Sequence, residues 1–492
     1  MPKSYISTSI PYVNGSPHIG FALEIIQADV IARYSHSIGE DVFFLTGTDE
    51  NSLKNVRVAL DKGVDVKELV DKNAKKYLEL KDIYSLSFND FIRTTEKRHF
   101  KGVEKLWKAC EKDIYKKTYQ GLYCVGCEAF YKEKELKDGL CPDHKKKPEL
   151  IEEENYFFKL SKYQEEIKEL ILSNKLKIVP ETRRNEILSL IDSGIEDICI
   201  SRSKERAHGW GIPVPGDSSQ VVWVWFDALS NYINGLGYGE DSKKFNEWWN
   251  KSDNRIHMVG KGVIRFHALY WIGMLLSAKI TLPTEIFVHG YITSNGEKMS
   301  KSLGNVVSPL DLAKKYDSDA VRYFLLREIP PFKDGDFTED RFVERYNSDL
   351  AKGLGNLFSR VLSVAQKIGI NNKYLDIKEI ESSNFQLEVD KTKNTIDVSL
   401  KDFEFNRVIK SIWKLISFCD QYIEKEKIWE KSEKQEKSIL ILLYAMSEIA
   451  KMLKPFLPKT SDKIRSFVSL EMKKDNLYFD IKKIGVLFPK IN

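Results

Sequence analysis

The chain has 492 residues, of which 42% are hydrophobic and 30% are charged, and its formal net charge is +5 at pH 7. A typical domain holds roughly 100–200 residues, so this length predicts three or four folding units. No stretch approaches the roughly 18 consecutive apolar residues of a membrane span, and the N-terminus does not resemble a signal peptide. These features argue against a membrane partner and predict a cytoplasmic protein, and the balanced charge permits a nucleic-acid partner without requiring one.

The first 50 residues predict a strand, a helix and a second strand. Residues 5–10 form a short β-rich run, and residues 41–45 form another. Between them, apolar residues recur at the spacing of one helix face, at Ile19, Leu23, Ile26 and Val30. Two strands joined by a helix with short connections predict a parallel sheet with a right-handed crossover.

The segment Pro17-His18-Ile19-Gly20 stands where the first strand leads into the helix. The start of a helix offers unpaired backbone N–H groups and the positive end of a dipole, both suited to phosphate. His18 adds a side-chain donor, and Gly20 would let a nucleotide approach the backbone closely. Taken alone, the tripeptide His18-Ile19-Gly20 is a weak signal and is more typical of a histidine in an ordinary turn.

A cysteine cluster occupies an expected insertion at residues 116–222, which otherwise reads as irregular polar sequence. Its two knuckles are Cys124-Val125-Gly126-Cys127 and Cys141-Pro142-Asp143-His144. Cys-x-x-Cys followed by Cys-x-x-His is typical of a tetrahedral structural Zn²⁺ site, which keeps no open position for catalysis. The alternative is a set of free thiols in a loop. The remaining cysteines are expected to be reduced packing residues.

A second strand–helix–strand unit lies downstream. Residues 256–259 and 286–292 are strand-like, with a turn at 260–262 and an apolar helix at 263–277 between them. We therefore predict an α/β fold with a Rossmann-like doubly wound parallel sheet, its halves at residues 1–115 and 223–290. Residues 291–345 form a connecting region, and residues 346–492, where helical periodicity dominates, form an α-helical bundle domain.

The connecting region carries Lys298-Met299-Ser300-Lys301-Ser302 between Gly296 and Gly304. Two lysines and two hydroxyl groups in five residues can gather around a polyphosphate, where positioning and charge stabilisation supply most of the catalysis. The alternative is a solvated basic turn.

The pairing of this loop with His18-Ile19-Gly20 resembles the class I aminoacyl-tRNA synthetases, which join a His-x-Gly-His motif to a Lys-Met-Ser-Lys-Ser loop. The resemblance implies that Mg²⁺ accompanies ATP and that Lys301, Lys298 and His18 act in catalysis. It implies ATP contacts from His18, Gly20, Lys298, Ser300, Lys301 and Ser302. Phe21 replaces the second histidine of the motif and cannot donate a hydrogen bond.

Further segments are similar to the methionine-specific members of this family. They include residues 10–15, Gly47-Thr48-Asp49-Glu50, Arg93-Thr94-Thr95 with Arg98-His99, and residues 224–232. The resemblance implies a methionine pocket formed by Ile10, Tyr12, Asp49, Trp225, Ala228, Tyr232, Val263, His267 and Trp271. Aromatic rings suit a thioether, since sulfur–aromatic contacts are worth roughly 0.3–1.5 kcal/mol each. Asn51-Ser52 departs from the His-Gly that is common in the family.

The helical region contains Asn356 and Arg360 at i and i+4 and, after a charged stretch, Trp429. The resemblance implies that these three residues read the CAU anticodon of tRNA(Met), initiator and elongator alike. An exposed tryptophan is a platform on which an unstacked base can lie. Several relatives carry an appended dimerising domain; this chain ends soon after residue 490, so we expect a monomer.

The resemblance implies that methionine is activated with ATP to methionyl-adenylate and transferred to the 3′-terminal adenosine of tRNA, without a nucleophilic side chain. One alternative is another class I synthetase, although the insertion is short for an editing domain. The other is a non-catalytic, zinc-bearing tRNA-binding paralogue.

Overall fold

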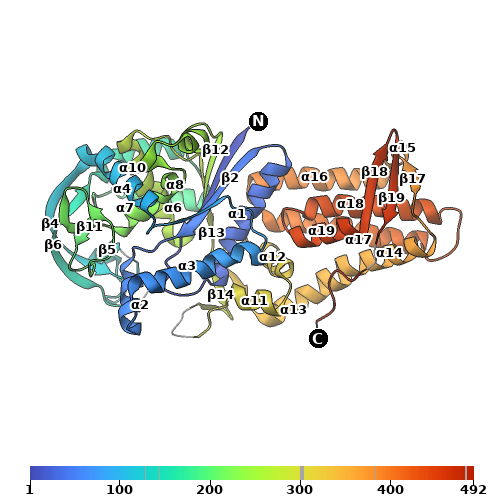
Figure 1. Ribbon diagram of the computed structural model, residues 1–492, viewed down its shortest axis with the longest axis horizontal. Coiled ribbons are helices and arrows are strands. Elements are labelled where there is room, and N and C mark those ends of the chain that lie inside the picture. The colour runs from blue at the N-terminus through green and yellow to red at the C-terminus, as the bar shows by residue number, and fades with distance from the viewer. Residues whose placement is uncertain (128, 143–144, 300–303, 382, 483–484, 492) are drawn as a thin grey trace. The chain divides into compact units, whose positions relative to one another are not determined.

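The computed structural model describes residues 1–127, 129–142, 145–299, 304–381, 383–482 and 485–491. The chain forms two compact units (Figure 1). The first comprises Met1–Pro17, Ser35–Lys81 and Leu86–His289, and the second comprises His18–Tyr34, Asp82–Ser85 and Gly290–Asn492. Among the described residues, no helix combines the length and the apolar character that crossing a bilayer would require.

A six-stranded sheet in which all neighbours are parallel organises the first unit, in the order β3-β2-β1-β12-β13-β7. Its strands are β1 (Lys3–Thr8), β2 (Asp41–Thr48), β3 (Asp90–Arg93), β7 (Lys177–Val179), β12 (Asn254–Gly260) and β13 (Glu285–His289). Chain order runs outward from β1 to β3 on one side and from β12 to β13 on the other, where β7 of the insertion forms the edge, and this order confirms the predicted doubly wound sheet. Open α/β sheets bind ligands beyond the carboxyl ends of the strands at such a reversal.

Helices of the first unit position the segments that follow the strands. They are α2 (Leu53–Lys62), α3 (Val66–Ile83), α4 (Lys97–Cys110), α5 (Gln164–Leu172), α6 (Glu181–Asp192), α7 (Val224–Leu229), α8 (Asn231–Asn234), α9 (Lys243–Phe245) and α10 (Ile272–Ala278), with π-helical turns at Asn246–Asn250 and Phe266–Trp271. Gly102 of α4 is required for close packing, because a Cβ there would lie 1.9 Å from Oδ1 of Asn234.

The insertion is more regular than its sequence indicates. It contains the antiparallel sheet β5-β4-β6-β8 and the sheet β10-β11-β9, and it also supplies β7 to the main sheet. The strands are β4 (Ile114–Cys124), β5 (Ala129–Tyr131), β6 (Glu149–Phe158), β8 (Ile198–Cys199), β9 (Ser201–Ser203), β10 (Pro213–Val214) and β11 (Asp217–Val222). The prediction of irregular structure was wrong because β4 and β6 are largely exposed, so charged residues hide the strand pattern.

The prediction of a single strand at residues 286–292 was also wrong, because these residues belong to two strands in two different sheets. β13 ends at His289 in the main sheet, and β14 (Ile292–Ser294) begins the sheet β15-β14-β16 of the second unit. The chain between them passes against a backbone, since a Cβ on Gly290 would lie 2.3 Å from the carbonyl carbon of Lys333.

The second unit is mainly helical, as predicted for the C-terminal region, and its long helices α14, α16, α17 and α18 lie alongside one another (Figure 1). Its helices are α1 (Ile19–Ser37), α11 (Pro309–Lys315), α12 (Ser318–Arg327), α13 (Glu339–Arg345), α14 (Asn356–Lys367), α15 (Ile377–Glu381), α16 (Asn384–Lys401), α17 (Phe405–Glu426), α18 (Gln435–Leu453) and α19 (Pro458–Phe467), with a π-helical segment at Tyr346–Gly355. Its other strands are β15 (Glu297–Lys298), β16 (Gly335–Phe337), β17 (Lys373–Asp376), β18 (Val468–Lys473) and β19 (Asn476–Ile481).

A fully buried ion pair joins α1 to α12 in the second unit. Nη2 of Arg322 lies 2.8 Å from a carboxylate oxygen of Asp29, and both side chains are inaccessible to solvent. The guanidinium also donates to the carbonyl oxygens of Tyr84, Pro455 and Phe456, at 3.2, 2.9 and 2.7 Å. One side chain therefore ties together two helices, the turn before α19 and residue 84.

We expect Arg322→Met to lower the free energy of unfolding by about 3–5 kcal/mol, because it leaves the Asp29 carboxylate with one fewer cation in a dry environment. Urea denaturation of the wild-type and variant chains measures the change. Arg407→Met is the matched control, since the Arg407–Glu404 pair is exposed and its loss should cost at most about 1 kcal/mol. Equal effects of the two substitutions would contradict the structural role of Arg322.

Candidate active site and metal cluster

Two residues of the expected methionine pocket, Tyr232 and His267, are joined by a hydrogen bond. The Tyr232 hydroxyl lies 2.6 Å from Nε2 of His267, and Nδ1 of His267 lies 2.8 Å from the Val263 carbonyl oxygen. A carbonyl only accepts, so Nδ1 carries the proton and the tyrosine donates to Nε2. Burial lowers the pKa of His267 to about 4, so the imidazole is neutral at pH 7.

A second buried histidine, His257 of β12, supports Trp271. The Trp271 indole Nε1 donates to Nε2 of His257 at 3.1 Å, and Nδ1 of His257 lies 2.6 Å from the Ser7 hydroxyl. Burial, followed by the nearby His267, lowers the pKa of His257 well below its usual value. The ring of His257 also lies against that of Tyr232, with centroids 4.1 Å apart. Sequence reasoning missed His257, although a polar residue in a buried strand was the available signal.

Trp225 and Ala228 lie on α7, and Trp225 is stacked on Phe266. The ring centroids are 3.7 Å apart and the planes are 7° from parallel. Phe266 directly precedes His267, so this stack brings α7 beside the π-helical turn that carries the histidine. The Trp225 indole nitrogen is buried and makes no hydrogen bond within the described part of the chain.

Tyr12 and Asp49 meet beyond the carboxyl ends of β1 and β2. They form an isolated parallel bridge in which the Asp49 N–H donates to the Pro11 carbonyl at 2.9 Å. Asp49 is only 2% exposed. The ammonium of Lys54 lies 4.7 Å from the centroid of the Tyr12 ring. Ile10, half-buried, precedes this pair in the same segment.

Glu50, directly after Asp49, is a fully buried carboxylate with several donors. Nε and Nη2 of Arg93 bind its two oxygens at 2.6 and 2.9 Å. The Thr48 hydroxyl donates to the same group at 2.8 Å, and Thr95 also donates to it. The ends of β2 and β3 are thereby held side by side.

Asn51 and Ser52, which depart from the family pattern, have structural roles here. Asn51 Nδ2 donates to a carboxylate oxygen of Asp227 at 2.8 Å, and Asp227 binds His99 of α4 through its other oxygen at 2.5 Å. The Ser52 hydroxyl accepts from the backbone N–H of Lys54 at the start of α2. Asn51, Asp227 and His99 were not predicted as a network.

His18 and Gly20 lie at the start of α1, in the second unit. The Gly20 N–H donates to Nδ1 of His18 at 3.1 Å, which places the proton of a neutral imidazole on Nε2. The Ile19 N–H donates to the Val307 carbonyl at 2.9 Å. The histidine motif is therefore tied to the segment that follows the lysine-serine loop.

The lysine-serine loop leaves from a hairpin of β14 and β15. Asn295 and Gly296 form its turn with φ of +53° and +77°, and the Gly296 N–H donates to Asp336 at 2.8 Å. The backbone of Lys298 pairs with Thr293. The predicted site residues Ser300, Lys301 and Ser302 lie outside the described residues.

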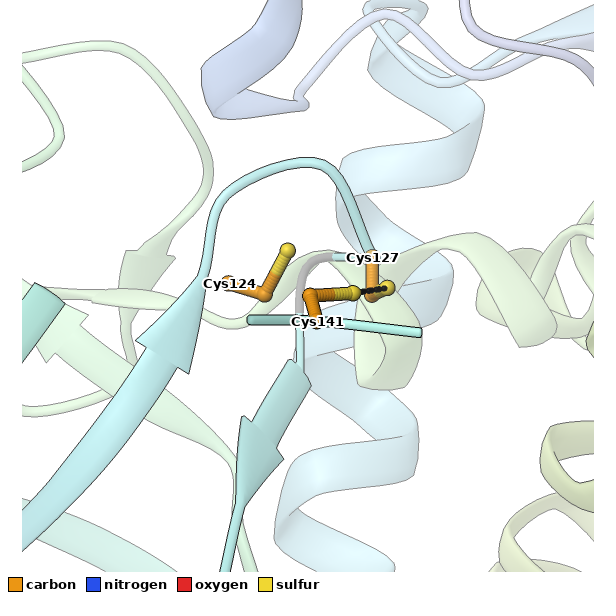
Figure 2. Close-up of side chains that lie close together, drawn as sticks. All are labelled: Cys124, Cys127 and Cys141. Atoms are coloured by element: carbon orange, nitrogen blue, oxygen red, sulfur yellow. Dashed lines mark hydrogen bonds between the residues drawn. The ribbon is translucent and has the colours of Figure 1, made fainter. Parts of the chain in front are cut away.

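Three of the four predicted zinc ligands converge (Figure 2). The sulfur atoms of Cys124, Cys127 and Cys141 all lie within 4.8 Å of one another, and those of Cys127 and Cys141 are 3.3 Å apart. Three thiols this close could hold a metal ion. The fourth predicted ligand, His144, lies outside the described residues.

The three predicted anticodon residues lie in the second unit. Asn356 and Arg360 are on α14, with Asn356 exposed, and Trp429 follows the end of α17 with 46% of its surface exposed. Arg360 is 2.5 Å from Glu424, and its guanidinium carbon is 5.7 Å from the centroid of a Trp429 ring. The structure thus brings Arg360 and Trp429 together.

Two protein families match the chain. The family described as "tRNA synthetases class I (M)" matches residues 4–147 and 132–362, and the "Anticodon-binding domain of tRNA ligase" matches residues 385–481. A "Methionine--tRNA ligase" of Fusobacterium nucleatum is 40% identical over 500 residues, covering 98% of this chain and 77% of that protein. A protein of the same name from Brucella suis is 37% identical over 484 residues, covering 96% and 93%.

Solved structures give the same result. The chain is similar to the Mycobacterium tuberculosis methionyl-tRNA synthetase in complex with methionyl-adenylate, with a TM-score of 0.92 at 34% sequence identity. The match covers 99% of this chain and 100% of that one.

We expect His267 to keep its proton on Nδ1 and to stay neutral from pH 8 down to about 5, because burial holds its pKa near 4. Because this pKa is depressed, the stability it contributes is full above about pH 6.5 and is lost as the pH falls toward 4. Correlation of ring ¹⁵N and ¹H signals in histidine-labelled protein measures both properties. Tyr232→Phe should leave the tautomer unchanged, since Val263 still accepts; a proton on Nε2, or titration near pH 6.5, would contradict the assignment.

Proposed function

This chain belongs to the class I methionyl-tRNA synthetase family and is an ATP-dependent methionine–tRNA ligase, and we propose that separate groups of its residues hold methionine, ATP and tRNA. The observation that best supports this division is the aromatic and imidazole cluster of Tyr232, His257, His267 and Trp271, which is built on β12 next to β1, the two strands at which the chain order of the sheet reverses.

The methionine side chain is proposed to lie against the cluster around Tyr232, with Trp225 and Ala228 on one side and Val263 on the other. Neutral imidazoles and aromatic rings offer a polarizable, uncharged surface, which suits a thioether. The ammonium group of methionine is proposed to bind Asp49, because the residue is a buried carboxylate beyond the end of a strand. Ile10 and Tyr12 precede it in the adjoining segment.

ATP is proposed to bind His18 and Gly20 at the start of α1 together with the lysine-serine loop. The start of a helix favours phosphate, and the bond from Ile19 to Val307 ties this start to the segment after the loop. Lys298, Ser300, Lys301 and Ser302 would then surround the phosphates. Mg²⁺ bound with ATP would add charge neutralisation.

The chemistry follows in two displacements. A carboxylate oxygen of methionine attacks the α-phosphorus of ATP, the bond to the bridging oxygen breaks, and pyrophosphate leaves. A hydroxyl of the 3′-terminal adenosine of tRNA then attacks the adenylate carbonyl, its proton is lost, and AMP leaves. Lys301, Lys298 and His18 are proposed to stabilise negative charge in the first step, so that the chain provides positioning rather than a nucleophile.

The cysteine cluster is proposed to hold a structural Zn²⁺. A tetrahedral zinc with bonds of about 2.3 Å places its sulfur ligands roughly 3.8 Å apart, and the three cysteines already lie within 4.8 Å. Thiolates also favour zinc over the hard cations. His144 is the proposed fourth ligand.

Asn356, Arg360 and Trp429 are proposed to bind the CAU anticodon, which is supported by the exposure of Asn356 and Trp429 and by the family match over residues 385–481, which includes Trp429. We further propose that the chain acts on both initiator and elongator tRNA(Met). It is proposed to be a monomer located in the cytosol, where its tRNA substrate is found.

ATP–pyrophosphate exchange with a panel of amino acids tests the function. We expect exchange with methionine, at least 100-fold weaker exchange with polar amino acids of similar size, and loss of exchange in Lys301→Ala. Binding of tRNA to Lys301→Ala, measured by filter retention, should be nearly unchanged. Equal exchange with glutamine would refute the methionine slot, and full exchange by the variant would remove Lys301 from the mechanism.

We expect one zinc per purified chain, and Cys141→Ser should lose most of it because a serine hydroxyl is a poor zinc ligand. Elemental analysis by mass spectrometry measures the metal content, and thermal unfolding measures the effect on stability. Cys199→Ser is the matched control, since Cys199 donates to the Ser201 carbonyl and a hydroxyl can make the same bond. Zinc retained in full by Cys141→Ser would exclude this cysteine as a ligand.

A further inference from the structure

We propose that Asp420, on α17, is a specificity-determining residue of the anticodon site, where its half-buried carboxylate accepts a hydrogen bond from the 4-amino group of a cytosine. The inference rests on the proposed tRNA(Met) function. It adds to Arg360 and Trp429 a residue that the sequence did not single out.

Two segments form the anticodon site: α17, and the chain from Tyr346 through the end of α14. They lie side by side and run in the same direction. Trp413 Nε1 donates to the Asp349 carbonyl at 3.2 Å, and further along both segments Arg360 binds Glu424 at 2.5 Å. The members of each pair are 64 residues apart in the sequence. The offset of 64 residues is the same at both points. The π-helical segment Tyr346–Gly355 and α14, which continues it, therefore keep one alignment along α17.

The same offset pairs Asp420 with Asn356. Both residues lie one helical turn before the ion pair of Glu424 and Arg360, because four residues of an α-helix advance the chain by about 6 Å. Asp420 therefore lies at the level of a proposed anticodon residue, and Arg360 is close enough to act on the charge of the Asp420 carboxyl.

Oδ1 of Asp420 is a buried acceptor that makes no hydrogen bond in the described part of the chain. Burial raises the pKa of the Asp420 carboxyl, while Arg360 opposes this effect and Glu424 adds to it. A buried acceptor left without a donor is unfavourable, and natural structures rarely keep one without a reason. A donor supplied by a bound base would satisfy the carboxylate.

The pairing edge of cytosine fits this arrangement, and that of uracil does not. A base stacked on Trp429 lies beside the Arg360 guanidinium, which can donate to the cytosine acceptors N3 and O2. The neighbouring position of cytosine is an amino group, for which a carboxylate is the natural acceptor. Uracil presents a carbonyl oxygen and an N3–H at these positions. Its carbonyl oxygen would face the Asp420 carboxylate, an acceptor facing an acceptor, and its N3–H would face Arg360, a donor facing a donor.

The test uses the full chain and two tRNA(Met) transcripts, with anticodons CAU and UAU. Asp420→Asn keeps the size of the side chain, and its amide can turn an N–H toward either base. We expect the ratio of kcat/KM for CAU over UAU to fall at least tenfold, with methionine-dependent pyrophosphate exchange unchanged. An unchanged ratio, or equal losses on both tRNAs, would overturn the inference and leave Asp420 a structural residue.

A modified tRNA separates the amino group from other contacts. Replacing the cytosine of CAU by pyrimidin-2-one removes the amino group alone. The wild-type chain should then lose about tenfold in kcat/KM, and Asp420→Asn should lose nothing further on this substrate. Additive losses from the two changes would show that the amino group and Asp420 do not interact.

Two further variants serve as controls. Glu404→Gln, at the exposed start of α17, should leave the CAU/UAU ratio unchanged, and Asp420→Ala should reduce it as Asp420→Asn does. A ratio retained by Asp420→Ala would also overturn the inference. A wild-type chain without methionine-dependent exchange would instead refute the proposed function, so the two failures can be distinguished.

Discussion

The first unit depends on one constraint, which is that the buried carboxylate of Glu50 must be neutralised where no water reaches it. Arg93 supplies both charge and two hydrogen bonds, and it comes from the end of the neighbouring strand β3. A buried carboxylate that lost this partner would be strongly destabilising. The requirement fixes how the loops after β2 and β3 lie against each other, and Asp49, directly before Glu50, takes its place from the same arrangement.

The architecture could be predicted because it follows from local patterns. The strand–helix–strand periodicity at the N-terminus gave the parallel sheet, and the cysteine spacing gave the three thiols that converge. The strands of the insertion, and the division of residues 286–292 between two sheets, could not be predicted from local patterns. Exposed antiparallel strands alternate weakly, and nothing local shows that a strand ends at His289 and the chain resumes in another sheet at Ile292.

The site was predicted through resemblance and completed only by the fold. Tyr232, His267 and Trp271 of the expected pocket lie together, but His257, which accepts a hydrogen bond from Trp271, is a single polar residue in the apolar run 256–259. The network of Asn51, Asp227 and His99 joins residues more than 100 positions apart, so no spacing reveals it. These partners become visible only when donors and acceptors are matched in three dimensions.

In the proposed methionine slot, the internal pairing of Tyr232, His267, His257 and Trp271 has a consequence for which amino acids are rejected. The Tyr232 hydroxyl, the Nδ1–H of His267 and the indole N–H of Trp271 each already donate to a neighbour in the wall. A hydrophilic side chain that entered the slot would lose its hydrogen bonds to water, and the wall would offer few hydrogen bonds to replace them. Discrimination against glutamine or lysine then arises from uncompensated dehydration, whereas an unbranched hydrocarbon chain of the same length would be turned away only weakly.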